Sequence, residues 1–239
     1  MKSGLPTMSD SDFIELCKKG SSQQINDAVE NGANLNTRDE EGRSPLMLAA
    51  SCNANPEVIR ILINEGADIH ARSEDGRTPL MFAAEYNTSP EVITVLINEG
   101  DDVHARDEDG RTCLMRAAAN NPNQEVILAL INNGADVNAK NKYRRTSLME
   151  AAWGSSNPAV VTALVNAGAD VNTRNKYGRT PLMIAARNNA NPEIIRTILS
   201  FGADPKARDD SSRIALDYAK GNEKLKNTDV FWKLNDVSY

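Results

Sequence analysis

Short apolar runs with helical spacing recur along the chain, and capping residues mark where they begin. In the segment 73–106, Thr78 precedes Pro79 and Ser89 precedes Pro90. A hydroxyl side chain at the N-cap followed by proline in the first turn is a typical helix start. The segment is therefore predicted to form two short helices. The second is apolar around much of its circumference, as expected for a helix buried between neighbours.

This two-helix pattern repeats along the chain with a fixed step of 34 residues. Three series of residues share the step, and chance does not produce three series in phase. Units that cannot cover their apolar faces alone bury them by stacking, so the chain is predicted to be one elongated array rather than two globular domains. The series are Gly32, Gly66, Gly100, Gly134, Gly168 and Gly202; Arg43, Arg77, Arg111, Arg145, Arg179 and Arg213; and Met47, Met81, Met115, Met149 and Met183.

The repeated residues resemble the ankyrin repeat. Thr180-Pro181-Leu182-Met183 with Ala185-Ala186, followed by Gly202-Ala203-Asp204, matches the T-P-L-H helix start, the alanine pair and the turn of that family. The resemblance implies an all-α solenoid of stacked helix-turn-helix repeats with hairpin loops. It also implies a non-enzymatic module that binds partners on its concave face, formed by the hairpin tips and the first helices.

The resemblance covers residues 11–239, which are predicted to form a single ankyrin repeat domain after a disordered extension over 1–10. Polar or atypical helix starts mark a cap at each end of the array. The predicted units are the cap 11–38, the repeats 39–72, 73–106, 107–140, 141–174 and 175–208, and the cap 209–239.

Two features depart from the family pattern. The period is 34 rather than 33, and the added residue falls in the loop between the helices, as in Asn53-Ala54-Asn55-Pro56. We expect a longer loop and an intact stack. Methionine also replaces the family's histidine after the leucine, as at Met81. That histidine links neighbouring repeats by hydrogen bonds, whereas methionine supplies only an adaptable apolar contact.

Composition narrows the class of protein. The chain is 40% hydrophobic and 25% charged with a net charge of -6, which is typical of a soluble folded protein. Its acidic pI of about 5.1 argues against DNA binding. No apolar stretch is long enough for a membrane span. Three widely spaced cysteines favour a reducing compartment, so we expect a cytoplasmic protein; the alternative is delivery outside the cell by a signal we do not recognise.

Candidate catalytic and metal-binding groups are few. His70 and His104 stand one repeat apart, and packed helices lie roughly 8–10 Å apart, too far for both to bind one zinc directly. We expect each to take the turn position that Asn138 holds in a later repeat. No histidine is placed to activate Cys52 or Cys113. The sequence therefore predicts no enzyme, no metal and no cofactor.

The repeats differ from one another mainly at the hairpin tips and on the first helices. The residues expected to contact a partner are Tyr86, Arg116, Tyr143, Trp153 and Tyr177, since Trp, Tyr and Arg dominate interface hot spots. For Trp153, packing on the neighbouring repeat over Gly154 is the alternative. The arginine series beside acidic hairpins predicts a solvated ion-pair ladder, with binding of an acidic partner as the alternative.

Charge is divided unevenly along the chain. Residues 1–120 carry 11 basic and 21 acidic residues, whereas residues 121–239 carry 16 and 12. This asymmetry either solubilises the surface or orients a dipolar partner. In the last segment, Phe231 and Trp232 are expected to seal the open end of the core, with a tail that binds a partner as the alternative.

The leading functional prediction is a monomeric scaffold that binds a protein partner along its concave groove. One alternative is a sensor of a small anionic ligand or nucleotide, which would stack on Trp153 and Tyr143 and pair with Lys142. Another is an engineered scaffold without a natural partner, although irregular residues such as Arg144 argue against it.

Overall fold

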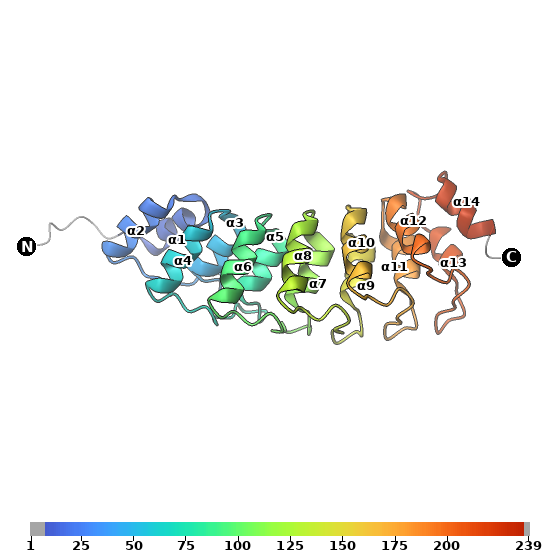
Figure 1. Ribbon diagram of the computed structural model, residues 1–239, viewed down its shortest axis with the longest axis horizontal. Coiled ribbons are helices and arrows are strands. Elements are labelled where there is room, and N and C mark those ends of the chain that lie inside the picture. The colour runs from blue at the N-terminus through green and yellow to red at the C-terminus, as the bar shows by residue number, and fades with distance from the viewer. Residues whose placement is uncertain (1–7, 237–239) are drawn as a thin grey trace, which may run out of the picture.

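Helices run in pairs along the computed structural model, which describes residues 8–236 (Figure 1). Fourteen helices and no strand occur in this range, so the predicted all-α solenoid is confirmed. The first helices of the units are α1 (Asp10–Lys19), α3 (Pro45–Cys52), α5 (Pro79–Tyr86), α7 (Cys113–Asn120), α9 (Ser147–Gly154), α11 (Pro181–Asn188) and α13 (Ala215–Ala219). The second helices are α2 (Ser22–Glu30), α4 (Pro56–Asn64), α6 (Pro90–Asn98), α8 (Gln124–Asn132), α10 (Pro158–Asn166) and α12 (Pro192–Ser200), and α14 (Asp229–Asp236) follows α13.

The predicted caps define the helix starts. The Thr78 hydroxyl accepts a hydrogen bond from the backbone N–H of Met81 at 3.4 Å, and Thr112 and Thr180 cap α7 and α11 in the same way. The second helices end at glycines with positive φ, for example Gly100 at 109°. Because only glycine adopts this conformation without steric cost, these positions set the period of the chain.

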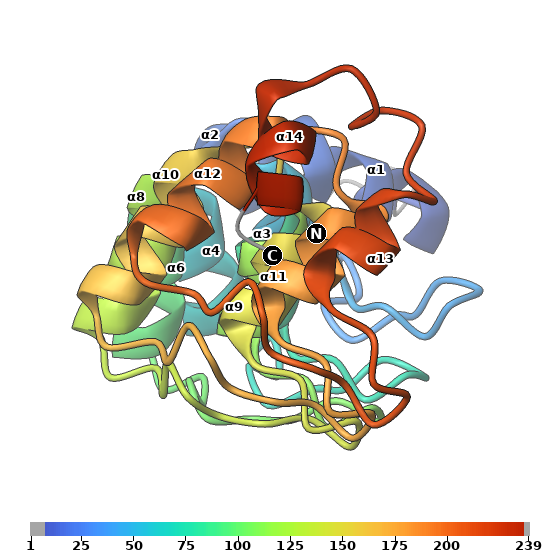
Figure 2. The same cartoon turned by 90° about the vertical axis from the view of Figure 1, so that its right-hand side faces the viewer.

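The core runs continuously along the stack between the two rows of helices. Each first helix packs against the first helices before and after it, and each second helix does the same in its own row (Figures 1 and 2). The methionine series is fully buried in the first row, with Met47, Met81 and Met115 at zero exposure. Figure 2, which looks along the stack, shows the hairpin loops projecting together from its lower side.

Asparagines in the lengthened inter-helix loops join the repeats. The Nδ2 amide of Asn87 donates to the backbone carbonyl oxygens of Ala50 and Asn53, in the preceding repeat, at 2.8 and 2.9 Å. The added residue of the 34-residue period thus leaves the stack intact and belongs to a loop that bonds the repeats to one another. The same pair of bonds is made by Asn53, Asn121, Asn189 and Asn222.

A second set of inter-repeat bonds comes from arginines just before the hairpins. Nη1 of Arg72 donates to the carbonyl oxygens of Gly76, in its own hairpin, and Arg106, one repeat on, at 2.7 and 2.9 Å. Together with the asparagines, these arginines supply the inter-repeat hydrogen bonds that the methionine series cannot make. Arg38, Arg106 and Arg174 bond in the same way, and Arg208 bonds to its own hairpin.

The repeat 141–174 lacks several of these devices. Lys140, the last residue of the preceding repeat, stands where the arginine that would bond to the hairpin of this repeat is found elsewhere, and Ser155 stands where the other repeats have the bonding asparagine. Arg144 takes the place of the hairpin glycine and keeps its positive φ of 56°. Ser147 replaces the first-turn proline, and the Thr146 side chain makes no cap hydrogen bond. Other hydrogen bonds still join it to its neighbours: the Nδ2 amide of Asn157 donates to the carbonyl oxygen of Pro122 at 2.8 Å, and that of Asn189 donates to Ala152 at 3.2 Å.

The ends of the array differ slightly from expectation. Helix α1 starts at Asp10 with Ser9 as its N-cap, so the folded part begins before residue 11; residues 1–7 of the predicted extension lie outside the described range. At the other end, Val230 and Leu234 of α14 are buried, whereas Trp232 is 59% exposed. The prediction that the aromatics seal the core is wrong for Trp232, because the amphipathic helix turns Val230 and Leu234 inward instead, whereas Phe231 is half-buried and packs against the core.

Candidate binding groove

First helices and hairpin loops form the two walls of a groove along the array. The hairpins are connected by backbone hydrogen bonds, such as that from the Lys142 N–H to the Asp109 carbonyl oxygen at 3.0 Å. Successive pockets lie between these two walls, and their lining residues run from Glu41, near one end of the array, to Gly221, near the other. We call this surface the groove.

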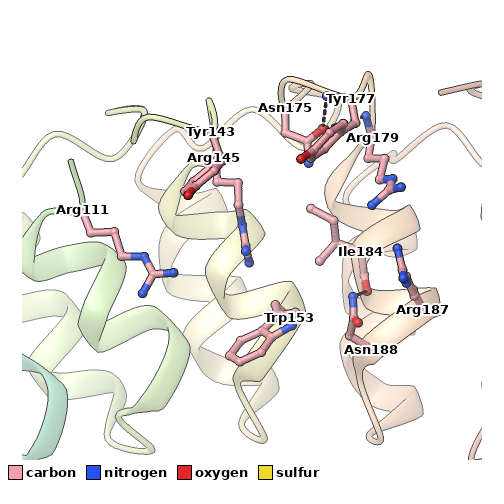
Figure 3. A pocket seen from close by; sticks show the side chains of 10 residues that line it. All are labelled: Arg111, Tyr143, Arg145, Trp153, Asn175, Tyr177, Arg179, Ile184, Arg187 and Asn188. Carbon is pink, nitrogen blue, oxygen red and sulfur yellow. Dashed lines mark hydrogen bonds between the residues drawn. The ribbon is translucent and has the colours of Figure 1, made fainter. Parts of the chain in front are cut away.

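The central pocket of the groove is rich in aromatic and basic side chains (Figure 3). It has a volume of about 310 Å³. Tyr143 and Tyr177 extend from consecutive hairpins and Trp153 from α9; their exposed fractions are 39%, 49% and 48%. These three aromatics are therefore available at the surface rather than sealed in the core. The lining residues are Arg111, Tyr143, Arg145, Trp153, Asn175, Tyr177, Arg179, Ile184, Arg187 and Asn188.

Cations stack on the aromatic rings of this pocket. The Lys176 Nζ lies 4.0 Å from the ring centroid of Tyr143 and 4.9 Å from that of Tyr177. The guanidinium carbon of Arg145 lies 5.9 Å from the Trp153 ring. Such contacts hold a cation over the ring face while the edges of a guanidinium stay free to donate hydrogen bonds.

The arginine series is paired unevenly along the groove. Near the N-terminal end, Arg43 lies 2.7 Å from Asp39 and 3.0 Å from Glu41, so its charge is matched by its own hairpin. Arg77 likewise pairs with Asp75 and Glu85. The predicted ion-pair ladder is present here, although these guanidinium groups are half-buried rather than fully solvated.

In the central pocket the same series has fewer acidic partners. Arg111 makes no ion pair within residues 8–236, and its Nε is buried without a hydrogen-bond partner there. Arg179 lies 3.8 Å from Asp209, beyond hydrogen-bonding distance. Arg145 pairs with Glu150 at 2.9 Å, but its Nε is unbonded in the described part of the chain. The Nε of Arg77, in the N-terminal half, is also unbonded among the described residues, so it is the smaller number of acidic partners that favours an anion in this pocket.

The comparisons with known proteins agree with this architecture. A family model for ankyrin repeats in three copies matches residues 13–107 and 83–175, and a model for ankyrin repeats in many copies matches residues 164–219. The chain belongs to the ankyrin repeat family. Ankyrin repeats generally mediate protein–protein interaction and are generally not enzymes. Among curated proteins, none matches this chain significantly.

Arg116 lies beneath the surface of this ankyrin repeat groove. Its side chain is 8% exposed and bonds to the carboxylate of Asp107, with Glu85 at 3.5 Å. A residue so enclosed is poorly placed to contact a partner directly, contrary to what the sequence suggested. The buried charge holds two carboxylates in place instead. Tyr86, in the preceding repeat, is 54% exposed.

Glu150 is the buried acid beside the central pocket. Its carboxylate faces Arg145 and also accepts a 3.4 Å hydrogen bond from the Asn141 amide. Burial raises the pKa of the Glu150 carboxyl, and the charges of the surrounding arginines oppose that rise. One enclosed carboxyl group therefore lies beside the central pocket, in the neighbouring pocket of the groove.

The remaining candidates for chemistry stay apart. The backbone N–H groups of His70 and His104 donate to Asp68 and Asp102 at 2.9 and 2.8 Å, as Asn138 does to Asp136. Within the described residues, no group of three or more His, Cys, Asp or Glu side chains is arranged to hold a metal ion. Over the same range, no helix has the length and apolarity that crossing a membrane requires.

Sequence reasoning missed the two bonding series, although both carried a signal. Asn53, Asn87 and Asn121 share the 34-residue step, as do Arg38 and Arg72. From the sequence alone, a recurring polar residue in a loop has no assignable role. Its long-range backbone acceptors become visible only when the repeats are stacked.

Proposed function

We propose that the protein is a non-enzymatic scaffold that binds a protein partner along the groove. The observation that carries this proposal is the exposure of Tyr143, Trp153 and Tyr177 in one pocket, at positions where stacking needs no aromatic side chain. Tyr86 extends the contact surface toward the N-terminal end. Arg116 acts from below by fixing Glu85 and the hairpin carboxylate of Asp107.

The unequal charge of the groove supports a fixed orientation for the partner. Glu74 and Asp75 line a pocket near the N-terminal end, whereas Arg179 and Arg187 line the central pocket. Complementary charge acts mainly on encounter rate and register, so the partner is expected to be basic at one end and acidic at the other. We place this monomeric scaffold in the cytoplasm, in keeping with its unpaired cysteines.

Capture from a cell lysate tests the scaffold. The immobilised protein is compared with Trp153→Ala and Tyr143→Ala, and Trp232→Ala serves as the matched control because Trp232 is exposed on α14, outside the groove pockets. We expect the two groove variants to lose captured proteins that Trp232→Ala retains. Identical captured sets for all four proteins would contradict the proposal.

Binding of a small anionic ligand or nucleotide is the second candidate, favoured by the unbonded guanidinium donors of the central pocket. A ligand specific for the folded state raises the melting temperature by mass action. A thermal-shift screen with nucleotides and inorganic phosphate therefore separates the two functions. A shift that Arg111→Gln abolishes, without any protein captured through the groove, would favour the sensor.

A further inference from the structure

The arginines of the series have fewer acidic neighbours in the C-terminal half of the groove, because two acidic residues of the hairpin are replaced there. Asp39 and Glu41 flank Arg43 in the first hairpin, and both pair with it. The equivalents around Arg145 are Asn141 and Tyr143. Around Arg179 they are Asn175 and Tyr177. These hairpins therefore keep the arginine and lose the two hairpin acids beside it. Arg145 is left with one ion pair, to Glu150 at 2.9 Å, and Arg179 lies 3.8 Å from Asp209.

Arg111 reaches a similar state by another route. Its hairpin retains both acids, Asp107 and Asp109, but the Asp107 carboxylate is bonded to the buried Arg116 and Asp109 makes no ion pair with Arg111 among the described residues. Arg111 is left without an ion pair among the described residues and with a buried, unbonded Nε. Three consecutive repeats thus present a guanidinium group with unused donors on one wall of the groove. Arg187 and Lys176 add positive charge without an ion pair in the part of the chain that the structure describes.

The spacing of these three guanidinium groups selects the shape of a ligand. Equivalent positions in stacked repeats follow the helix spacing, roughly 8–10 Å. A peptide extended in the polyproline II conformation has three residues per turn and advances about 3.1 Å per residue, so every third side chain points the same way and comes level with the next repeat. A carboxylate is the planar partner that a guanidinium binds with two parallel hydrogen bonds.

We propose that the C-terminal half of the groove binds an extended peptide segment of the partner whose acidic side chains recur at every third residue. Arg111, Arg145 and Arg179 each bind one carboxylate. The intervening residues of the segment are apolar and pack on Tyr143, Trp153 and Tyr177. This inference rests on the proposed scaffold function and names the chemistry of its partner.

An extended peptide fits this surface better than the other polyanions. A helix is about 10–12 Å wide, and the pocket of about 310 Å³ seats side chains rather than a helical segment. A nucleic acid would extend from the pocket toward Glu74, Glu108 and the other acidic hairpin tips of the N-terminal half, where phosphates are repelled. The net charge of -6 acts in the same direction.

Fluorescence anisotropy with a labelled peptide tests whether the groove requires an acidic side chain at every third residue. The probe is a nine-residue peptide with Asp at positions 1, 4 and 7 and Leu or Ala elsewhere. Its control is the same composition with the three Asp residues adjacent. We expect the spaced peptide to bind about tenfold tighter than the control, since only it can reach all three arginines. Equal binding of the two peptides, or no binding up to about 1 mM peptide, overturns the proposal.

Variants locate the contact. Arg111→Gln should weaken binding of the spaced peptide about fivefold to tenfold and flatten its salt dependence. Arg60→Gln removes the same charge from α4, away from the groove pockets, and should leave affinity unchanged. Glu150→Gln removes the competing buried carboxylate and should leave the affinity unchanged or raise it. Melting temperatures verify that each variant is folded. An equal loss of affinity for the spaced peptide in Arg60→Gln and Arg111→Gln would contradict the contact between Arg111 and the peptide.

Two further ligands separate the alternatives. A peptide with Asp at every seventh residue tests a helical ligand, and single-stranded oligonucleotide tests a nucleic acid. Tighter binding of either than of the spaced peptide overturns the proposal. If capture from lysate depends on Trp153 while the spaced peptide does not bind, the proposed scaffold function stands. The proposal of a partner segment with acidic side chains at every third residue is then overturned.

Discussion

The side-chain amide of Asn121 donates a 2.8 Å hydrogen bond to the backbone carbonyl oxygen of Asn87, one repeat earlier. Asn121 also bonds to Ala84, so a single side chain joins two segments of the preceding repeat. The equivalent residue of the next repeat is Ser155, whose hydroxyl bonds only within its own loop, to Asn157. The bond between repeats is therefore missing at this point.

Restoring that asparagine should stabilise the protein. Ser155→Asn is expected to raise the free energy of unfolding by about 1 kcal/mol, because it satisfies two backbone carbonyl groups. Urea denaturation measures the change. The reverse substitution one repeat earlier, Asn121→Ser, is the control and should lower stability by a similar or larger amount. A destabilised Ser155→Asn variant would show that the loop of this repeat cannot adopt the bonded geometry.

Arg144→Gly should also stabilise the fold. Arg144 occupies the hairpin position with φ of 56° that glycine holds in four other repeats, and a left-handed conformation costs a side-chain-bearing residue about 1 kcal/mol. Thermal and urea unfolding should both shift upward. Lys142→Gly in the same hairpin is the matched control and should not stabilise, because Lys142 has a negative φ.

Because the carboxyl group of Asp101 is buried, we expect the free energy of unfolding to fall as the pH rises. It is buried where other repeats have alanine, such as Ala67 and Ala135, and burial raises its pKa to about 6, although the Leu80 N–H and the Thr78 hydroxyl favour the ionised form. Its ordinary pKa is 3.8. Between these values the folded state binds more protons than the unfolded state, so stability is lost as pH rises toward 6.

Asp101→Ala should remove this dependence. We expect a gain of about 1–2 kcal/mol relative to the unchanged protein above pH 7 and little gain near pH 4. Urea denaturation across this pH range measures both. A variant that is less stable at every pH would mean that the hydrogen bond from Leu80 outweighs the cost of the buried charge.

Asp209 makes the opposite contribution at the C-terminal cap. Burial disfavours its charge, but hydrogen bonds from the Tyr218 hydroxyl and from the backbone N–H groups of Arg213 and Ser211 lower its pKa to about 2. Stability from this group is therefore present above its ordinary pKa of 3.8 and lost as pH falls toward 2. Asp209→Asn should cost about 1–2 kcal/mol at pH 7 and progressively less below pH 4. A loss that does not change with pH would contradict this assignment.

The three thiols should differ sharply in reactivity. Burial raises the pKa of Cys17 and of Cys113 to about 12, whereas Cys52 is exposed. Because the thiolate is the reactive form, the folded protein should react rapidly with one equivalent of a thiol reagent at pH 8, and with all three only after unfolding. Cys52→Ser should remove the fast equivalent. Rapid reaction of a second thiol would show that an end of the array opens.

The stacked fold followed from the sequence because its signals recur in phase. The helix start at Thr78 and Pro79 and the helix end at Gly100 have equivalents in the other repeats. An atypical residue in one repeat therefore does not obscure the pattern. The exposed aromatics Tyr143, Trp153 and Tyr177 were predicted in the same way, as departures from the repeated pattern. A substitution at a scaffold position that packing does not need is visible without coordinates.

Residues whose roles depend on distant partners could not be assigned from sequence. Arg116 looked like a hot-spot arginine, but Asp107 and Glu85 reach it from two other elements and enclose it. Trp232 looked like a core seal, yet the tilt of a short terminal helix turns it outward. In both cases the outcome depends on which neighbours come within a few ångströms, and the linear pattern carries no such distances.

Lys140 and Ser155 each omit hydrogen bonds that recur elsewhere in the array, yet the repeat 141–174 keeps others. The Nδ2 amide of Asn157 donates to the carbonyl oxygen of Pro122 at 2.8 Å, and that of Asn138 donates to Gly168 at 2.9 Å. The polar links between repeats are thus redundant, so the loss of one series at one interface leaves the rod continuous. This redundancy tolerates departures from the repeated pattern in the unit that carries Trp153.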